Sequence, residues 1–142
     1  MERKCSSLPY LALMRTSKAI QERMRLEMAE EKLSLTEFAV LEVLYMKGRQ
    51  TIQQVGSNVL ISSGSMTYII DKLETRGLLA RSSCPSDRRA IYLALTAEGK
   101  SVMESIMPKH KESIDYIFDS LHDDEAEILV RLLKKISSRV EE

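Results

Sequence analysis

The feature that most constrains this fold is a pair of helix starts that lie close together in the chain. Thr51-Ile52-Gln53-Gln54 has the capping-box pattern, in which the first and fourth residues satisfy each other's backbone amides. Ser62 or Ser63 can cap a second helix, whose apolar stripe runs from Met66 to Leu73 and which ends at Arg76-Gly77. The sequence therefore predicts a short helix, a tight connection and a second helix.

A β-hairpin is predicted directly after this helix pair. Residues 78–84 have β-compatible composition, and residues 90–95 alternate between apolar and small or aromatic side chains. Pro85-Ser86-Asp87-Arg88-Arg89 lies between them and is predicted to form the loop at the hairpin tip. The expected fold class is mainly α with a small β-hairpin wing, a winged helix-turn-helix in which the second helix of the pair enters a DNA groove.

Longer helices flank this region on both sides. Apolar residues recur at helical spacing from Leu8 to about Glu31, and Ser34-Leu35-Thr36-Glu37 is a capping box that opens a nearly continuous apolar helix. Another helix starts at about Thr96, and a last one follows His122. A small winged domain could not cover the apolar stripes of the outer helices, so we expect a symmetric dimer to bury them.

The charge balance supports a nucleic-acid partner only locally. Lys plus Arg and Asp plus Glu both number 21, so the net charge is zero. Residues 51–95, however, carry five cations and three anions, which leaves a net charge of +2 on the predicted winged region. No apolar run approaches the roughly 18 residues of a membrane span, and no apolar signal region follows the N-terminus, so we expect a cytosolic protein.

Candidate DNA-binding residues lie on the outer face of the second helix and on the hairpin. Small or hydrogen-bonding side chains off the apolar stripe can reach phosphates and base edges, and a guanidinium group suits both. The helix candidates are Ser62, Ser63, Ser65, Thr67, Tyr68 and Lys72, and the hairpin candidates are Asp87, Arg88 and Arg89. Serines also cap ordinary helices and Asp and Arg are common in turns, so the argument depends on where these residues lie together.

Several motifs resemble those of the MarR family of bacterial transcriptional regulators. They are Ser62-Ser63-Gly64-Ser65-Met66-Thr67, Asp71-Lys72-Leu73-Glu74 leading to Arg76-Gly77-Leu78-Leu79 with Arg81, Asp87-Arg88-Arg89, and Leu95-Thr96-Ala97-Glu98-Gly99. The resemblance extends over nearly the whole chain. It implies one MarR-type chain over residues 1–142 with a winged core at 34–99, in which the helix-turn-helix is 51–76 and the wing is 78–95. Residues 8–32 and 100–140 would be dimerisation helices.

The same resemblance implies a function. The family typically forms homodimers that bind a pseudo-palindromic double-stranded DNA operator, usually as repressors that a small molecule or thiol oxidation releases. Carried onto this chain, Asp87 would orient Arg89, Arg89 would enter the minor groove, and Arg88 would contact backbone phosphate. A narrow minor groove concentrates negative potential and attracts an inserted Arg.

The sequence says less about the identity of the effector than about the residues that bind DNA. The run from Cys84 to Arg89 resembles a Gram-positive subgroup associated with quinones and other aromatic electrophiles, and Met14, Phe38 and Tyr45 could line a site for an apolar effector. Cys5, beside basic residues, and Cys84 are candidate redox-sensing thiols. Both cysteines can equally be unreactive, and Met and aromatic residues at helical spacing are usually core.

Other classes of protein have weaker support. The sequence has no nucleophile elbow, no His-Glu-x-x-His and no phosphate-binding loop, so we expect no enzyme and no cofactor. His110 and His122 show no metal-ligand spacing with the cysteines, so we expect no metal site. The more serious alternative is a winged domain that contacts another protein, because a fold does not determine a function.

Overall fold

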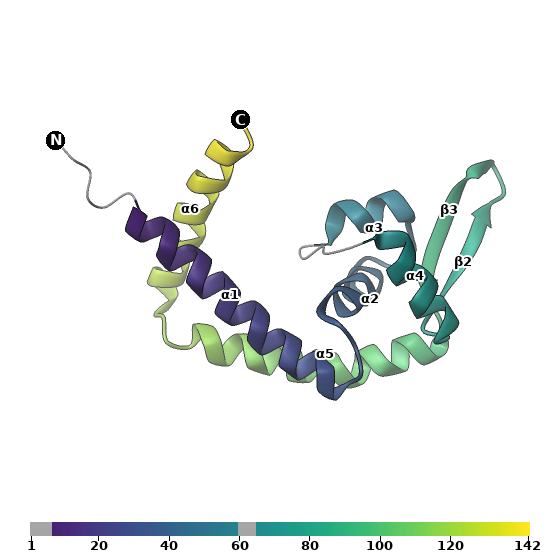
Figure 1. Ribbon diagram of the computed structural model, residues 1–142, viewed down its shortest axis with the longest axis horizontal. Coiled ribbons are helices and arrows are strands. Elements are labelled where there is room, and N and C mark those ends of the chain that lie inside the picture. Colours follow the sequence, from purple (N-terminus) through teal and green to yellow (C-terminus); the bar gives the residue numbers. More distant parts are fainter. Residues whose placement is uncertain (1–6, 60–64) are drawn as a thin grey trace. The chain divides into compact units, whose positions relative to one another are not determined.

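The computed structural model describes residues 7–59 and 65–142, which belong to two compact units, Met1–Met103 and Glu104–Glu142. The first unit contains seven complete elements and the start of an eighth, α5, and the second contains the rest of α5 and α6 (Figure 1). In chain order the elements are α1 (Ser7–Glu30), α2 (Leu35–Lys47), β1 (Gln50–Thr51), α3 (Ile52–Asn58), α4 (Met66–Thr75), β2 (Leu79–Cys84), β3 (Asp87–Leu95), α5 (Ala97–Phe118) and α6 (Asp123–Val140).

Helix α2 forms the centre of the core in the first unit. The predicted capping box is present, since Ser34 Oγ accepts from the Glu37 amide at 3.0 Å and a Glu37 carboxylate oxygen accepts from the Ser34 amide at 2.9 Å. The apolar residues Val40 and Leu41 are completely buried. The nearly continuous apolar helix predicted after Ser34 is therefore present, and it is buried.

Helices α3 and α4 form the predicted helix pair. The Thr51 hydroxyl and the Gln54 side chain make the expected reciprocal cap of α3. Ser65 is the N-cap of α4, so the prediction that Ser62 or Ser63 caps this helix is wrong; both serines lie outside the described residues. After α4, Gly77 has φ +76°, a conformation that a residue without a Cβ adopts easily, and it ends the helix as predicted.

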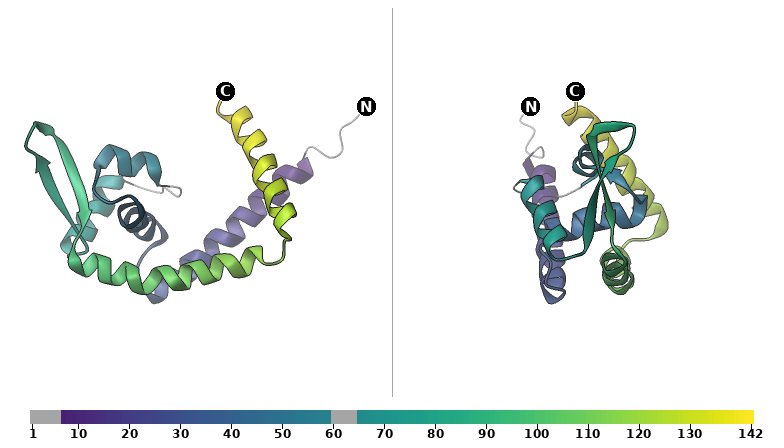
Figure 2. Two further views of the ribbon diagram at one scale, coloured as in Figure 1. Left: turned by 180° about the vertical axis from the view of Figure 1, so that it is seen from behind. Right: turned by 90° about the vertical axis from the view of Figure 1, so that its right-hand side faces the viewer.

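The sheet has three antiparallel strands in the order β1-β3-β2. Strands β2 and β3 form a long hairpin whose tip projects away from α2 and α4 (Figure 2). Its turn contains only Pro85 and Ser86, so the prediction of a five-residue loop is wrong: the segment 87–89 lies in β3. The sequence also did not predict β1, whose Gln50 pairs with Leu93.

The connection from β3 to α5 explains the motif Thr96-Ala97-Glu98-Gly99. The Thr96 hydroxyl donates to the Gly77 carbonyl at 2.6 Å and accepts from the Gly99 amide at 3.0 Å, so it joins the start of α5 to the end of α4. A Cβ on Gly99 would lie only 1.9 Å from the Leu78 carbonyl oxygen. Glycine is therefore required for this close approach of two backbone segments.

The outer helices expose much of their apolar surface. In α1, Met24 and Met28 are buried, whereas Leu8, Tyr10 and Met14 are more than half exposed. Helix α6 has no buried residue, although its apolar side chains repeat at three- and four-residue steps. None of the helices within residues 7–59 and 65–142 is long and apolar enough to cross a membrane.

Candidate nucleic-acid interface

The outer face of α4 has the character expected of a helix that enters a DNA groove. Ile69, Ile70 and Leu73 are buried on the inner face, and Thr67 and Tyr68 are exposed on the opposite side. Tyr68 is 66% exposed, which leaves its hydroxyl and ring free to meet a ligand. Ser65 already serves as the helix cap, because its hydroxyl accepts from the Tyr68 amide at 3.5 Å.

The two arginines near the hairpin tip lie in an irregular part of β3. Ser83 pairs with Ile91 but Cys84 pairs with Asp87, a register shift that leaves residues 88–90 without a paired residue in β2. Arg89 lines a hollow of about 360 Å³ together with Ile52 and Gln53 at the start of α3, and Arg88 does not line it. Of the two arginines, Arg89 is therefore the one that lies beside the start of α3.

Asp87 holds the backbone of Arg89. One Asp87 carboxylate oxygen accepts from the Arg89 amide at 2.9 Å, a contact between residues two apart that tightens the chain after the turn. Both Arg88 and Arg89 are exposed, and neither forms an ion pair with a residue in the described ranges. Their guanidinium groups are thus available to an anion.

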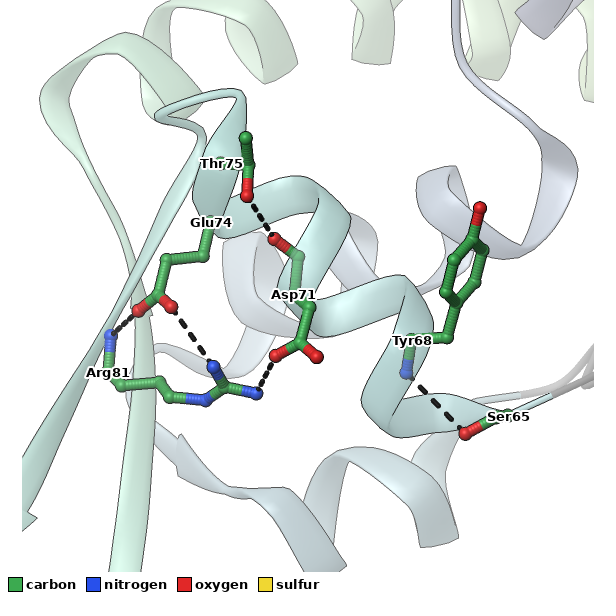
Figure 3. A network of polar contacts seen from close by, with 6 residues as sticks. All are labelled: Ser65, Tyr68, Asp71, Glu74, Thr75 and Arg81. Atoms are coloured by element: carbon green, nitrogen blue, oxygen red, sulfur yellow. Dashed lines mark hydrogen bonds and ion pairs between the residues drawn. The ribbon is translucent and has the colours of Figure 1, made fainter.

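Arg81, which contributes to the local positive charge, is engaged within the protein. From β2 its guanidinium reaches Asp71 at 2.5 Å and Glu74 at 3.0 Å, both on α4 (Figure 3). The hydrogen bond with Asp71, supported by the charges of both carboxylates, raises the pKa of Arg81 above its already high ordinary value. The cations available on this face are therefore fewer than the five that residues 51–95 contain.

A buried carboxylate joins the other side of α4 to α2. Arg76 at the end of α4 donates from one nitrogen, Nη1, both to Glu37 at 3.3 Å and to the Lys32 carbonyl at 2.9 Å. The Lys72 ammonium lies 4.0 Å from the Glu37 carboxylate, and its side chain is half exposed. Lys72, predicted to bind DNA, is therefore shared between Glu37 and the solvent.

The pKa of Glu37 is lowered even though the residue is buried. Burial raises this pKa, but hydrogen bonds from the Ser34 amide and hydroxyl and the charges of Lys72 and Arg76 together outweigh it. A folded-state pKa below the ordinary value of 4.5 means that ionised Glu37 stabilises the fold. That contribution is complete above the unfolded-state pKa and is lost as the pH falls through the folded-state pKa.

Glu37→Gln should therefore remove part of the acid sensitivity of the protein. We expect a loss of about 1–3 kcal/mol at neutral pH, because Arg76 loses its ionised partner, and a smaller difference from the parent below pH 4. Urea unfolding between pH 3 and pH 7 measures both quantities, with the exposed Glu30→Gln as the matched control. An equal difference between parent and variant at every pH would contradict the assignment.

Arg49 is a cation at the wing that sequence reasoning missed. Its guanidinium lies 4.4 Å from the ring centre of Tyr92 in β3, a distance typical of cation–π contacts. No local pattern identifies this pair, because Arg49 meets Tyr92 only through the pairing of β1 with β3.

The three residues predicted to line an effector site differ in their exposure to solvent. Phe38 is only 3% exposed and belongs to the core, whereas Met14 is 51% and Tyr45 is 37% exposed. Phe38 and Tyr45 lie two turns apart on the same face of α2.

Within the described ranges, no group of three or more His, Cys, Asp or Glu residues is arranged to hold a metal ion.

Cys84 ends β2 beside the hairpin turn, and Cys5 lies outside the described residues. The Cys84 sulfur is 3.1 Å from the Ser86 hydroxyl. This hydrogen bond, followed by contacts with the Ser86 and Asp87 amides, lowers the pKa of the Cys84 thiol. A lower pKa increases the thiolate fraction, which is the reactive form.

A helix pair with a polar outer face, followed by a cationic hairpin, defines a winged helix-turn-helix DNA-binding protein. The MarR family model matches residues 33–91, and "HTH-type transcriptional regulator MhqR" of Bacillus subtilis is 39% identical over 127 residues, covering 89% of this chain and 88% of that protein. The chain belongs to the MarR family of transcriptional regulators, which are not enzymes.

Solved structures of the family have the same fold. NadR in complex with 4-hydroxyphenylacetate has a TM-score of 0.77 and 25% identity, and covers 96% of each chain. A mutant MarR from E. coli, complexed with operator DNA, has a TM-score of 0.78 and 20% identity, and covers 96% of this chain and 99% of its own. The family fold and the predicted fold class are thus confirmed.

Proposed function

We propose that this chain is a homodimeric repressor that binds a pseudo-palindromic operator. Helix α4 enters the major groove through Thr67, Tyr68 and Lys72, with Ser65 at its start. Ser62 and Ser63, which precede Ser65 in the chain and lie outside the described residues, remain proposed DNA contacts on their sequence alone. Arg89 enters the adjacent minor groove and Arg88 contacts backbone phosphate. The observation that carries the proposal is that both wing arginines are exposed and form no ion pair with a described residue, beside a helix whose outer face is polar.

The exposed apolar residues of α6 support the homodimer. Leu132, Leu133 and Ile136 are 36–46% exposed, and with Ile128 and Val140 they form a stripe along one face. A stripe of this kind on a surface helix indicates an interface, and two-fold symmetry would let two winged units read two half-sites about 34 Å apart. Residues 8–32 and 100–140 are the proposed dimerisation helices, and a DNA partner implies action in the cytoplasm.

A small aromatic or phenolic compound is the proposed releasing effector. The NadR structure contains a hydroxyphenyl ligand, and the run from Cys84 to Arg89 resembles the subgroup associated with aromatic electrophiles. Met14 and Tyr45 are exposed enough to contact such a ligand, with Phe38 below Tyr45 on the same face of α2.

Release through a thiol is the second candidate, and the lowered pKa of Cys84 favours it. Cys84 comes directly before the hairpin turn and pairs with Asp87 across it, so a bulky adduct on the thiol would disturb the wing. Cys5 remains a candidate on its sequence alone.

One titration tests these proposals. The duplex that carries the chain's own upstream region should bind more tightly than a scrambled duplex, and phenols, quinones and peroxides should be compared as releasing agents. Release by aromatic compounds in the Cys5→Ser/Cys84→Ser variant would eliminate thiol sensing. Equal affinity for both duplexes would count against an operator in that region, and no DNA binding at all would favour a protein-binding winged domain.

A further inference from the structure

Two exposed carboxylates lie on the helix that is proposed to enter the DNA groove. Asp71 follows Thr67 by four residues and Tyr68 by three, so it belongs to the same outer face, and Glu74 is one turn further along. The Asp71 side chain is 55% exposed and that of Glu74 is 39% exposed. Next to DNA phosphates both negative charges would be repelled, and Lys72 on the same helix is already close to Glu37.

The Arg81 side chain, in strand β2 of the wing, contacts both of these carboxylates. Its Nη2 meets Asp71, its Nη1 meets Glu74, and its own backbone amide donates to the second Glu74 oxygen at 3.2 Å. Figure 3 shows the guanidinium lying between the two carboxylates and directed at α4. The side chain is only 27% exposed, less than either partner, so its charge is used within the protein.

We propose that Arg81 is a positioning residue that supports DNA binding without touching DNA: it neutralises the Asp71 and Glu74 carboxylates on the outer face of α4. This inference rests on the proposed function. A planar guanidinium can meet two carboxylates at once, whereas an ammonium is a point charge.

The experiment measures the affinity of the full-length protein for the duplex carrying its own upstream region. Arg81→Gln should weaken binding about tenfold, because two unpaired carboxylates then face the phosphates. Adding Asp71→Asn and Glu74→Gln should restore the affinity to within about threefold of the parent, with the parent's salt dependence. Arg81→Lys should bind with intermediate affinity.

The matched control is Arg89→Gln, which removes the same charge from the wing. The Asp71→Asn/Glu74→Gln pair should not restore the specific affinity of that variant, since Arg89 is proposed to contact DNA directly. If Arg81 contacted phosphate, the triple variant would stay weak and its salt slope would fall by about one, which would overturn the proposal. Unchanged binding of Arg81→Gln would overturn it as well.

Thermal unfolding shows whether Arg81→Gln is folded. A further variant tests the proposal even if Arg81→Gln is not folded. Asp71→Asn/Glu74→Gln with Arg81 retained should bind as tightly as the parent or more tightly, because the freed guanidinium adds positive charge. Weaker binding by this variant, once shown to be folded, would contradict the proposal. If the parent itself binds no DNA, the proposed function fails; if only these variants depart from expectation, the inference on Arg81 fails alone.

Discussion

Replacing Arg89 with alanine is expected to weaken binding to the upstream duplex by about 10- to 100-fold, which corresponds to roughly 1–3 kcal/mol. The residue is exposed, forms no ion pair with a described residue, and lines a hollow together with the start of α3. A guanidinium inserted in a narrow minor groove loses its most favourable electrostatic contact when it is truncated. The slope of log affinity against log salt should become shallower by about one.

Two controls separate this contact from a general effect of charge. Arg88→Ala removes the same charge from the neighbouring position, which does not line that hollow, so it should weaken binding to specific and scrambled duplexes alike. Arg25→Ala removes a charge that is paired with Glu22 on α1 and should leave the affinity unchanged. Equal affinity of Arg89→Ala and the parent across a range of salt concentrations would rule out the proposed role of the wing.

The double substitution Leu132→Gln/Ile136→Gln is expected to convert the dimer into a monomer. Both side chains are 46% exposed one turn apart on the apolar face of α6, and glutamine preserves helix propensity while removing the apolar contact. A monomer would read one half-site, so affinity for the full operator should fall by about 100-fold or more. Sedimentation measures the mass, and titration of the duplex measures the affinity.

Lys134→Gln is the matched control for α6, since it lies on the polar side of the same helix. It should sediment as the parent does. A double variant that keeps the mass of the parent and binds DNA equally well would show that this stripe does not form the dimer interface.

Local elements were predictable because their determinants lie a few residues apart. The Ser34–Glu37 and Thr51–Gln54 capping boxes are contacts between residues three apart, and the apolar stripe of α4 follows from helical spacing. The hairpin was harder to predict, since its exposed end lacks the apolar alternation that identifies a strand. Asp87, Arg88 and Arg89 therefore looked like a loop, although all three belong to β3.

The sequence by itself determined the succession of helices, the wing and the family to which the chain belongs, because these depend on short-range patterns. Only the tertiary structure decided which charges are available. In the sequence, Arg81 and Arg89 are both arginines of the same predicted hairpin, and nothing local distinguishes them. In the structure, Arg81 forms ion pairs with Asp71 and Glu74 on α4, whereas Arg89 has no ion-pair partner within the described ranges. That difference arises from the packing of β2 against α4, since a charge is neutralised by what lies near it in space.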